Sequence, residues 1–249
     1  MKKLTIIFFI SLTIVFSSCD VLMQVLDQAS SESSLTQSEV VKGLREALSV
    51  GTVSSVKVLN TTNGYFKDNA VKILLPKEAN VIVENIKKVP GVGQTTIDDL
   101  VLRINRSAED AAKEAKPIFI NAITSMSIQD GMTILKGNNT AATSYLKQKT
   151  YNKLLSSFKP KINNSLNKKL VGNVSTNKAW TNITTIYNKV APFIGKPKVN
   201  TNLGDYVAKR ALDGLFLKVA DEEKKIRANP YNYVSDIIKK VFGYAKNNK

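Results

Sequence analysis

A single cysteine at the end of a short apolar run has the clearest chemistry in this sequence. Two lysines precede the apolar residues 4–16, and the small residues Ser17 and Ser18 stand directly before Cys19. The run is shorter than the roughly 20 residues that a membrane-spanning helix needs. Positive charge before such a run and small residues after it are typical of a secretory signal peptide. We therefore predict that signal peptide 1–18 is cleaved and the thiol of Cys19 acylated. The alternative is a plain secretory signal with an incidental thiol.

This prediction implies both a location and a domain organisation. We expect the lipidated cysteine and a Ser-rich tether at 19–35, a helical domain at 36–243 and a basic tail at 244–249. The acylated cysteine would attach the chain to the outer membrane of a Gram-negative bacterium, on its periplasmic or its surface side. Because the sequence has one cysteine only, no disulfide within the chain and no cysteine-based zinc site is possible.

The sequence contains no histidine, which narrows the chemistry open to it. Ser-His-Asp catalysis and the commonest transition-metal ligand are excluded. A Gly-rich phosphate loop, a Ser-x-x-Lys nucleophile motif and an acidic calcium loop are also missing from the sequence, so we predict neither a cofactor nor a metal. A carboxylate-dependent hydrolase or lyase acting on envelope polymer stays as the enzymatic alternative. It requires two acids in one pocket, such as Glu109 with Glu222 or Asp213.

Lysine is concentrated in the middle of the chain. Residues 131–204 contain twelve lysines and no acidic residue, in a sequence whose formal net charge is +16. In an exported protein, so many lysines close together in the sequence favour an anionic partner, such as anionic lipid, lipopolysaccharide or wall polymer. Nucleic acid is disfavoured because an exported protein rarely meets it, and a plain solvated face is the alternative. The candidate binding residues are Lys147, Lys149, Lys153, Lys161, Lys168 and Lys169.

A second set of candidates consists of charged residues within predicted helices. We treat them as a candidate polar cluster, with ordinary helix pairing as the competing interpretation. Four-residue spacing predicts three such pairs: Arg106 with Asp110, Glu109 with Lys113, and Glu223 with Arg227. The set contains Arg45, Arg103, Arg106, Glu109, Glu222, Glu223 and Arg227.

Apolar residues recur at intervals of three and four along most of the chain, which predicts an all-α domain of about seven to nine helices. The strongest periodic run begins at Thr96, and we expect Pro117 to kink that helix or to split it at Lys116. Pro160 should interrupt a later helix for the same reason. Ser127 with Asp130 has the spacing of a helix-starting capping box.

Five ordered motifs resemble a family of bacterial envelope proteins catalogued as domain of unknown function 4197. They are GLREALSVGT at 43–52, AVKILLP at 70–76, the run 105–122 containing EAKPIF, ALDGLF at 211–216 and EEKKIRANP at 222–230. The resemblance covers about residues 36–243. It implies a helical, exported and often lipid-anchored body, and it transfers no catalytic residue. Together these features predict a binding or scaffolding module with a basic surface, whose protein partner the sequence does not identify.

Overall fold

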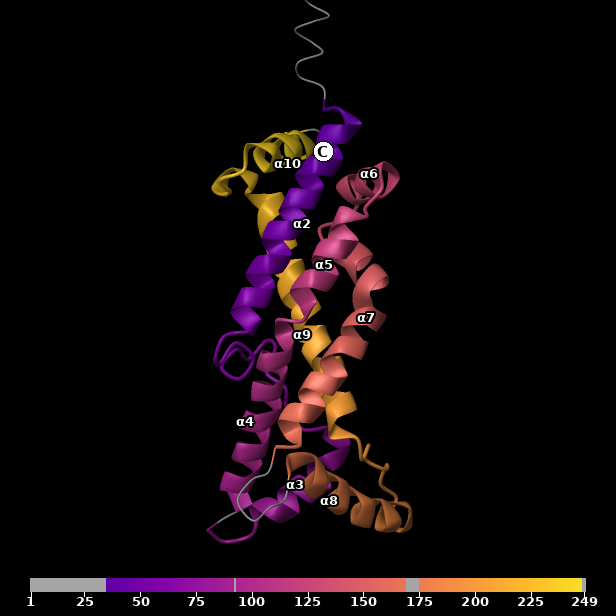
Figure 1. The fold of residues 1–249 in the computed structure, drawn as a ribbon. Coiled ribbons are helices and arrows are strands. Elements are labelled where there is room, and N and C mark those ends of the chain that lie inside the picture. The colour runs from indigo at the N-terminus through magenta and orange to yellow at the C-terminus, as the bar shows by residue number, and fades with distance from the viewer. Residues whose placement is uncertain (1–34, 92, 169–174, 248–249) are drawn as a thin grey trace, which may run out of the picture. The chain divides into compact units, whose positions relative to one another are not determined.

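Helices joined by turns make up the chain wherever the computed structural model describes it, which is at residues 35–91, 93–168 and 175–247 (Figure 1). No strand occurs in these ranges, so the all-α prediction is confirmed. The described residues from Gln37 onward form one compact unit. The signal peptide, Cys19 and Lys169 lie outside the described residues. The α-helices are α2 (Gln37–Leu59), α3 (Asn80–Lys87), α4 (Gly93–Ala112), α5 (Ala115–Thr124), α6 (Ile128–Lys136), α7 (Ala141–Leu166), α8 (Thr176–Val190), α9 (Leu203–Ala228) and α10 (Asp236–Asn247).

Helix α9 is the element around which the others pack. It contacts α7, α2, α4, α8 and α10, and its buried residues occur along its whole length. Gly214 lets other side chains come close to the helix, because a Cβ atom there would lie 3.0 Å from the ring of Tyr65. The Tyr65 hydroxyl donates a 2.8 Å hydrogen bond to the carbonyl of Ala211. Phe216 meets Phe119 of α5 edge to face, with ring centroids 5.8 Å apart.

The predicted break at Pro160 is wrong. Helix α7 runs from Ala141 to Leu166 with Pro160 inside it. A proline removes the backbone donor that would bond to the residue four positions earlier, which here is Ser156. Both residues are exposed, so water can reach the carbonyl of Ser156. The buried side chains Leu154, Phe158 and Ile162 hold the helix on its other face.

The long periodic run does divide near Pro117, but one turn earlier than expected. Helix α4 ends at Ala112 and α5 begins at Ala115. Pro117 therefore lies in the first turn of α5, where a helix leaves backbone donors unpaired in any case. A proline costs least at such a position, so the chain places the break before it.

Polar side chains cap the starts of α6, α8 and α9. Ser127 and Asp130 form the predicted capping box at the start of α6, and the side chain of Ser175 caps α8. The side chain of Asn202 accepts the backbone N–H of Asp205 at the start of α9. No helix in the described part of the chain is long and apolar enough to span a bilayer.

Candidate functional site

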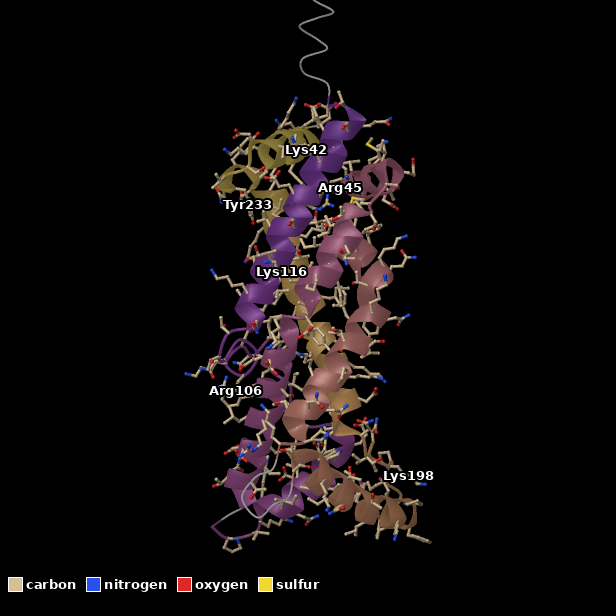
Figure 2. All side chains as sticks on the ribbon, viewed as in Figure 1. Lys42, Arg45, Arg106, Lys116, Lys198 and Tyr233 are labelled. Atoms are coloured by element: carbon tan, nitrogen blue, oxygen red, sulfur yellow. The ribbon has the colours of Figure 1, made fainter. Side chains whose placement is uncertain are left out.

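The seven charged residues of the candidate polar cluster do not meet at one place. Figure 2 shows Arg45 on α2 and Arg106 on α4 at different levels of the unit. Two buried carboxylates, Glu109 and Glu223, each organise a separate set of contacts.

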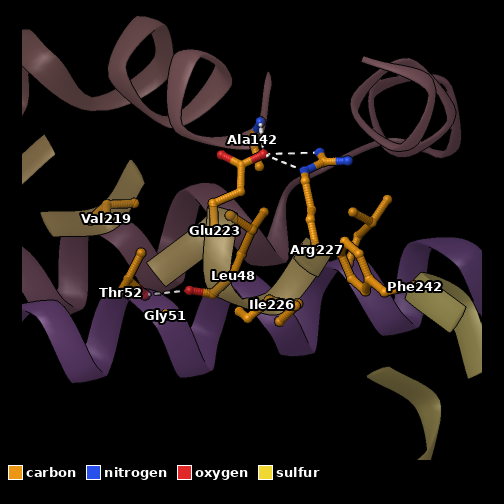
Figure 3. A pocket seen from close by; sticks show the side chains of 11 residues that line it. Leu48, Gly51, Thr52, Ala142, Val219, Glu223, Ile226, Arg227 and Phe242 are labelled. Carbon is orange, nitrogen blue, oxygen red and sulfur yellow. Dashed lines mark hydrogen bonds and ion pairs between the residues drawn. The ribbon is translucent and has the colours of Figure 1, made fainter. Parts of the chain in front are cut away.

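Glu223 of α9 binds the start of α7 (Figure 3). Its Oε1 accepts the backbone N–H of Ala142 at 3.0 Å, and its Oε2 accepts the backbone N–H and the hydroxyl of Thr143, both at 2.8 Å. The N-cap residue Thr140 makes no side-chain capping bond. Glu223 therefore does from another helix what an N-cap residue does locally, and its negative charge suits the positive end of the helix dipole.

Arg227 lies one turn further along α9 and balances this buried charge. Its guanidinium approaches Oε1 of Glu223 at 2.9 Å, through Nε and one terminal nitrogen. It also donates 2.9 Å and 3.4 Å hydrogen bonds to the carbonyls of Ile134 and Leu135, in the last turn of α6. The pair thus joins the end of α6, the start of α7 and the body of α9. The predicted four-residue pairing of Glu223 with Arg227 forms, but it is buried.

A small cavity adjoins this pair. Its volume is about 20 Å³, which is room for about one water molecule. Apolar side chains from α2, α9 and α10 make up most of its wall, including Leu48, Ile226 and Phe242 (Figure 3). A site of this size holds no substrate, and the polar atoms of Glu223 already have partners. This arrangement suits a structural role.

Glu109 of α4 performs a similar task for the turn after α2. Its Oε1 accepts the backbone N–H groups of Tyr65 and Phe66 at 3.2 and 3.1 Å, and Arg106 approaches its Oε2 at 2.6 Å. Arg106 also donates a 2.8 Å hydrogen bond to the side chain of Asn63, whose φ of 73° places it in the left-handed region. The side chains of Arg106 and Glu109 thus hold this turn against α4.

The pairs predicted for this part of α4 are therefore wrong. Arg106 bonds to Glu109 and Asn63 rather than to Asp110, and Lys113 bonds to Asp110 at 2.8 Å rather than to Glu109. Four-residue spacing predicts pairing along an exposed helix face. In the folded protein, Glu109 instead accepts hydrogen bonds from backbone N–H groups of the turn. These bonds are favoured because a buried N–H group without a partner lowers the stability of the fold.

Sequence reasoning missed Asn105, which is fully buried. Its side chain accepts the backbone N–H of Ile73 and donates to the Ile73 carbonyl, both at 2.8 Å. One amide thereby replaces a neighbouring strand for the non-helical residues 72–76. The available signal was a polar residue at a position where the helical period of α4 predicts an apolar one.

Comparison with known families identifies the family of this chain. The family model described as a protein of unknown function (DUF4197) matches residues 34–243. The chain belongs to this family. The comparison matches no curated protein and no solved structure. The motifs through which the sequence resembles DUF4197 supply the contacts above. AVKILLP contributes Ile73, the run 105–122 contributes Asn105 and Glu109, and EEKKIRANP contributes Glu223 and Arg227.

The other members of the predicted cluster have ordinary partners in this DUF4197 chain. Arg103 pairs with Asp99 at 2.6 Å, and Glu222 pairs with Lys225 at 2.6 Å. Arg45 donates a hydrogen bond to the carbonyl of Met126, while its Nε is buried with no hydrogen-bond partner. Arg45 therefore ties α2 to the turn before α6.

A larger hollow lies between α2 and α9 and has a volume of about 330 Å³. It is lined by small or apolar residues of α2 and by four charged residues of α9: Lys218, Asp221, Glu222 and Lys225. Its charges are mostly satisfied within the protein, because Lys225 pairs with Glu222 and Lys218 pairs with Asp68 at 2.5 Å. No group of three or more histidine, cysteine, aspartate or glutamate residues in the described part could hold a metal.

The predicted lysines of α7 are all exposed where the structure describes them, but they differ in their partners. Lys161 pairs with Glu114 at 3.2 Å. Lys147, Lys149 and Lys153 take part in no ion pair of the described chain. Lys147 lies 5.9 Å from the ring centroid of Tyr151, and the ammonium of Lys149 lies 5.6 Å from that of Tyr145. Lys168 is exposed and likewise takes part in no ion pair there.

Proposed function

We propose that this DUF4197 chain is an exported protein, anchored through acylated Cys19 to the outer membrane of a Gram-negative bacterium. In this proposal it binds or scaffolds anionic envelope material through lysines on α7. The observation that carries the proposal is the set Lys147, Lys149 and Lys153, which are exposed on one helix and have no carboxylate within ion-pair distance in the described chain.

Aromatic rings beside Lys147 and Lys149 support a binding role for this part of α7. The ammonium of Lys147 lies 5.9 Å from the ring centroid of Tyr151 and 5.8 Å from that of Phe216, and the residue is exposed. Its charge remains available to an anion in solution. The charge of Lys149 does act on Asp130, whose pKa is lowered first by hydrogen bonds from Ser127 and then, more weakly, by this lysine.

The buried carboxylates argue against the enzymatic alternative. A hydrolase or lyase needs two acids that face one substrate pocket. Glu109 and Glu223 belong to separate contact sets, and backbone N–H groups and arginines occupy their oxygens. Asp213 is exposed and pairs with Arg210 at 3.2 Å. The partners of these three carboxylates all belong to the protein itself, which supports a structural role for them.

The lysines are not needed to hold the protein on a membrane. Acyl chains contribute about 0.8 kcal/mol for each buried methylene, whereas one lysine near an anionic surface contributes only about 1 kcal/mol. The α7 lysines would instead orient the anchored protein or capture a partner.

The anchor is tested by mass spectrometry of the protein taken from native membranes. We expect an amino terminus at Cys19 that carries acyl chains, and a Cys19→Ala variant that leaves the membrane fraction. An unprocessed amino terminus, or a free thiol in soluble material, would contradict the anchoring.

The binding surface is tested by reversing its charge. The triple variant with Lys147→Glu, Lys149→Glu and Lys153→Glu should be retained much less strongly on anionic envelope material. Retention of the unmodified protein should fall as the salt concentration rises. Lipopolysaccharide, phosphatidylglycerol vesicles and isolated wall polymer form three arms that identify the partner. The matched control reverses Lys42, Lys57 and Lys67, which are exposed and change the net charge equally. Equal retention of the two triple variants would contradict a role for α7.

A further inference from the structure

An exposed apolar stripe on α8 and the following turn is the feature that the proposed function does not use. Large apolar side chains here are unusually open to solvent: Phe193 is 89% exposed and Ile186 is 67% exposed. The complete stripe is Ile183, Ile186, Val190, Phe193 and Ile194, and it continues from α8 into the 3₁₀ turn η3 (Ala191–Ile194).

The spacing of these residues makes the stripe one continuous face. Intervals of three and four residues separate Ile183, Ile186 and Val190, which places them on the same side of α8. The helix is fixed to the protein by a different side. Trp180 and Thr184 are buried, and the indole N–H of Trp180 donates a 2.9 Å hydrogen bond to the carbonyl of Asn200. The stripe is therefore not needed to attach α8 to the fold.

Lysines flank the apolar stripe. Lys178, Lys189, Lys196 and Lys198 are exposed, and none of them takes part in an ion pair of the described chain. No acidic residue occurs between 131 and 204 to compensate them. An exposed apolar face bordered by lysines matches an anionic lipid surface, where rings and aliphatic chains enter the headgroup boundary and lysines meet phosphates. A second copy of this chain would bring like charges together, which disfavours pairing through the same face.

The length of chain before the described residues allows this face to reach the membrane that holds the anchor. Sixteen residues, 20–35, separate Cys19 from Thr36. Such a segment can span up to about 55 Å when extended, whereas the 26-residue helix α9 is about 39 Å long. Figure 1 shows α8 and α10 near opposite ends of α9. When extended, the linker is longer than α9, so an anchor at Cys19 does not prevent the unit from turning its α8 face toward the same bilayer.

We propose that the exposed face of α8 and η3 docks on the surface of an anionic lipid bilayer, with Phe193 and Ile186 in the headgroup boundary. This inference rests on the proposed anchoring at the envelope membrane, and it does not depend on the α7 lysines. It predicts a fixed orientation of the protein on the membrane rather than free movement on a tether.

A reporter at the stripe tests the docking directly. In the processed chain, residues 19–249 with Cys19→Ser, no other cysteine remains. Phe193→Cys then carries a single environment-sensitive nitrobenzoxadiazole fluorophore. With vesicles of equal parts phosphatidylglycerol and phosphatidylcholine, its emission should shift to the blue and be quenched by nitroxides on the lipid chains. The matched label at Val234→Cys, 96% exposed near α10, should not respond.

A binding measurement gives the second test. Ile186→Ser with Phe193→Ser should weaken partition onto these vesicles by at least about tenfold, because both side chains lose apolar surface. The control, Leu74→Ser with Val234→Ser, removes exposed apolar side chains elsewhere and should bind as the parent does.

Three results would overturn the docking inference. The label at position 193 could stay in water while the protein sediments with vesicles, which would leave binding through α7 intact. It could shift without vesicles as protein concentration rises, which would indicate pairing of copies. The stripe variant and its control could also bind equally. Failure of the α7 charge reversal alone, with a normal response at 193, would instead contradict the proposed function and leave this docking in place.

Discussion

Glu223 and Arg227, one turn apart on α9, hold the ends of two other helices. Glu223 binds the first backbone N–H groups of α7, and Arg227 binds the last carbonyls of α6. Each side chain thus satisfies helix-end groups that have no partner within their own helix. The pair is 6% and 8% exposed at its side chains, so neither charge can turn to water if the other is removed.

Removing the charge of Glu223 should therefore destabilise the protein strongly. We expect Glu223→Gln to lower the free energy of unfolding by about 2–4 kcal/mol, because Arg227 would stay buried without its counter-charge. Urea denaturation followed by circular dichroism measures this. Glu222→Gln removes a neighbouring carboxylate that pairs with the exposed Lys225, and it should cost less than about 1 kcal/mol. Similar losses in the two variants would contradict the capping role.

Two glycines of α2 should respond in opposite ways to alanine. A Cβ atom at Gly43 would lie 2.6 Å from Cγ2 of Val241 on α10, so Gly43→Ala should destabilise the protein by about 1–3 kcal/mol. At Gly51 the nearest atoms are at 3.5 Å, an ordinary contact. Gly51→Ala should therefore stabilise the protein by about 0.5–1 kcal/mol through helix propensity. The midpoint temperatures of thermal unfolding of the two variants measure this difference. A Gly43→Ala variant that is more stable than the parent would refute the close approach of α10.

Asn105 should control the order of the segment beside it. Asn105→Ala removes both hydrogen bonds to Ile73 and leaves two buried backbone groups unpaired, at a cost of about 1–3 kcal/mol. Amide hydrogen exchange at Ile73 should speed up well beyond that of the α9 core. The control Asn85→Ala removes an exposed amide that bonds only within α3. Unchanged protection at Ile73 would exclude this role for Asn105.

Acid should weaken the contact between α7 and α9. Hydrogen bonds from Lys159 and Lys209 lower the pKa of Asp205 below its usual range. A carboxyl with a lowered folded-state pKa contributes stability above its unfolded-chain pKa of about 4, and this is lost as the pH falls through the folded-state value. Asp205→Asn should therefore cost up to about 1 kcal/mol at neutral pH, and the difference from the parent should vanish in strong acid. Denaturation curves across this pH range test it, and a difference that persists in acid would count against the ion pairs.

Much of the helical architecture follows from local sequence signals. The capping box of Ser127 and Asp130, the Ser175 cap and the apolar period of α9 each act within a few residues. Such interactions form wherever the chain adopts a helix, so they can be inferred from spacing alone. The pairing of Glu223 with Arg227 can likewise be inferred from spacing, because the two residues are four positions apart on one helix.

The errors in the sequence interpretation have one physical origin. Pro160 does not break α7 because side chains from other helices hold that helix on its buried face. Glu109 does not pair with Lys113 because it accepts hydrogen bonds from the backbone N–H groups of Tyr65 and Phe66, which are more than forty residues away in sequence. The value of each contact depends on burial and on partners distant in sequence, neither of which local spacing contains.

By itself, the sequence determined the all-α class, the membership of the DUF4197 family, the concentration of lysine in the middle of the chain and the starts of several helices. Only the tertiary structure decided that Glu109 and Glu223 serve the fold, and that the isoleucines of α8 face solvent. Helical periodicity shows that residues share a face, and it applies equally to a buried and an exposed one. Which face is covered depends on the packing of other helices, and that is decided when the whole chain folds.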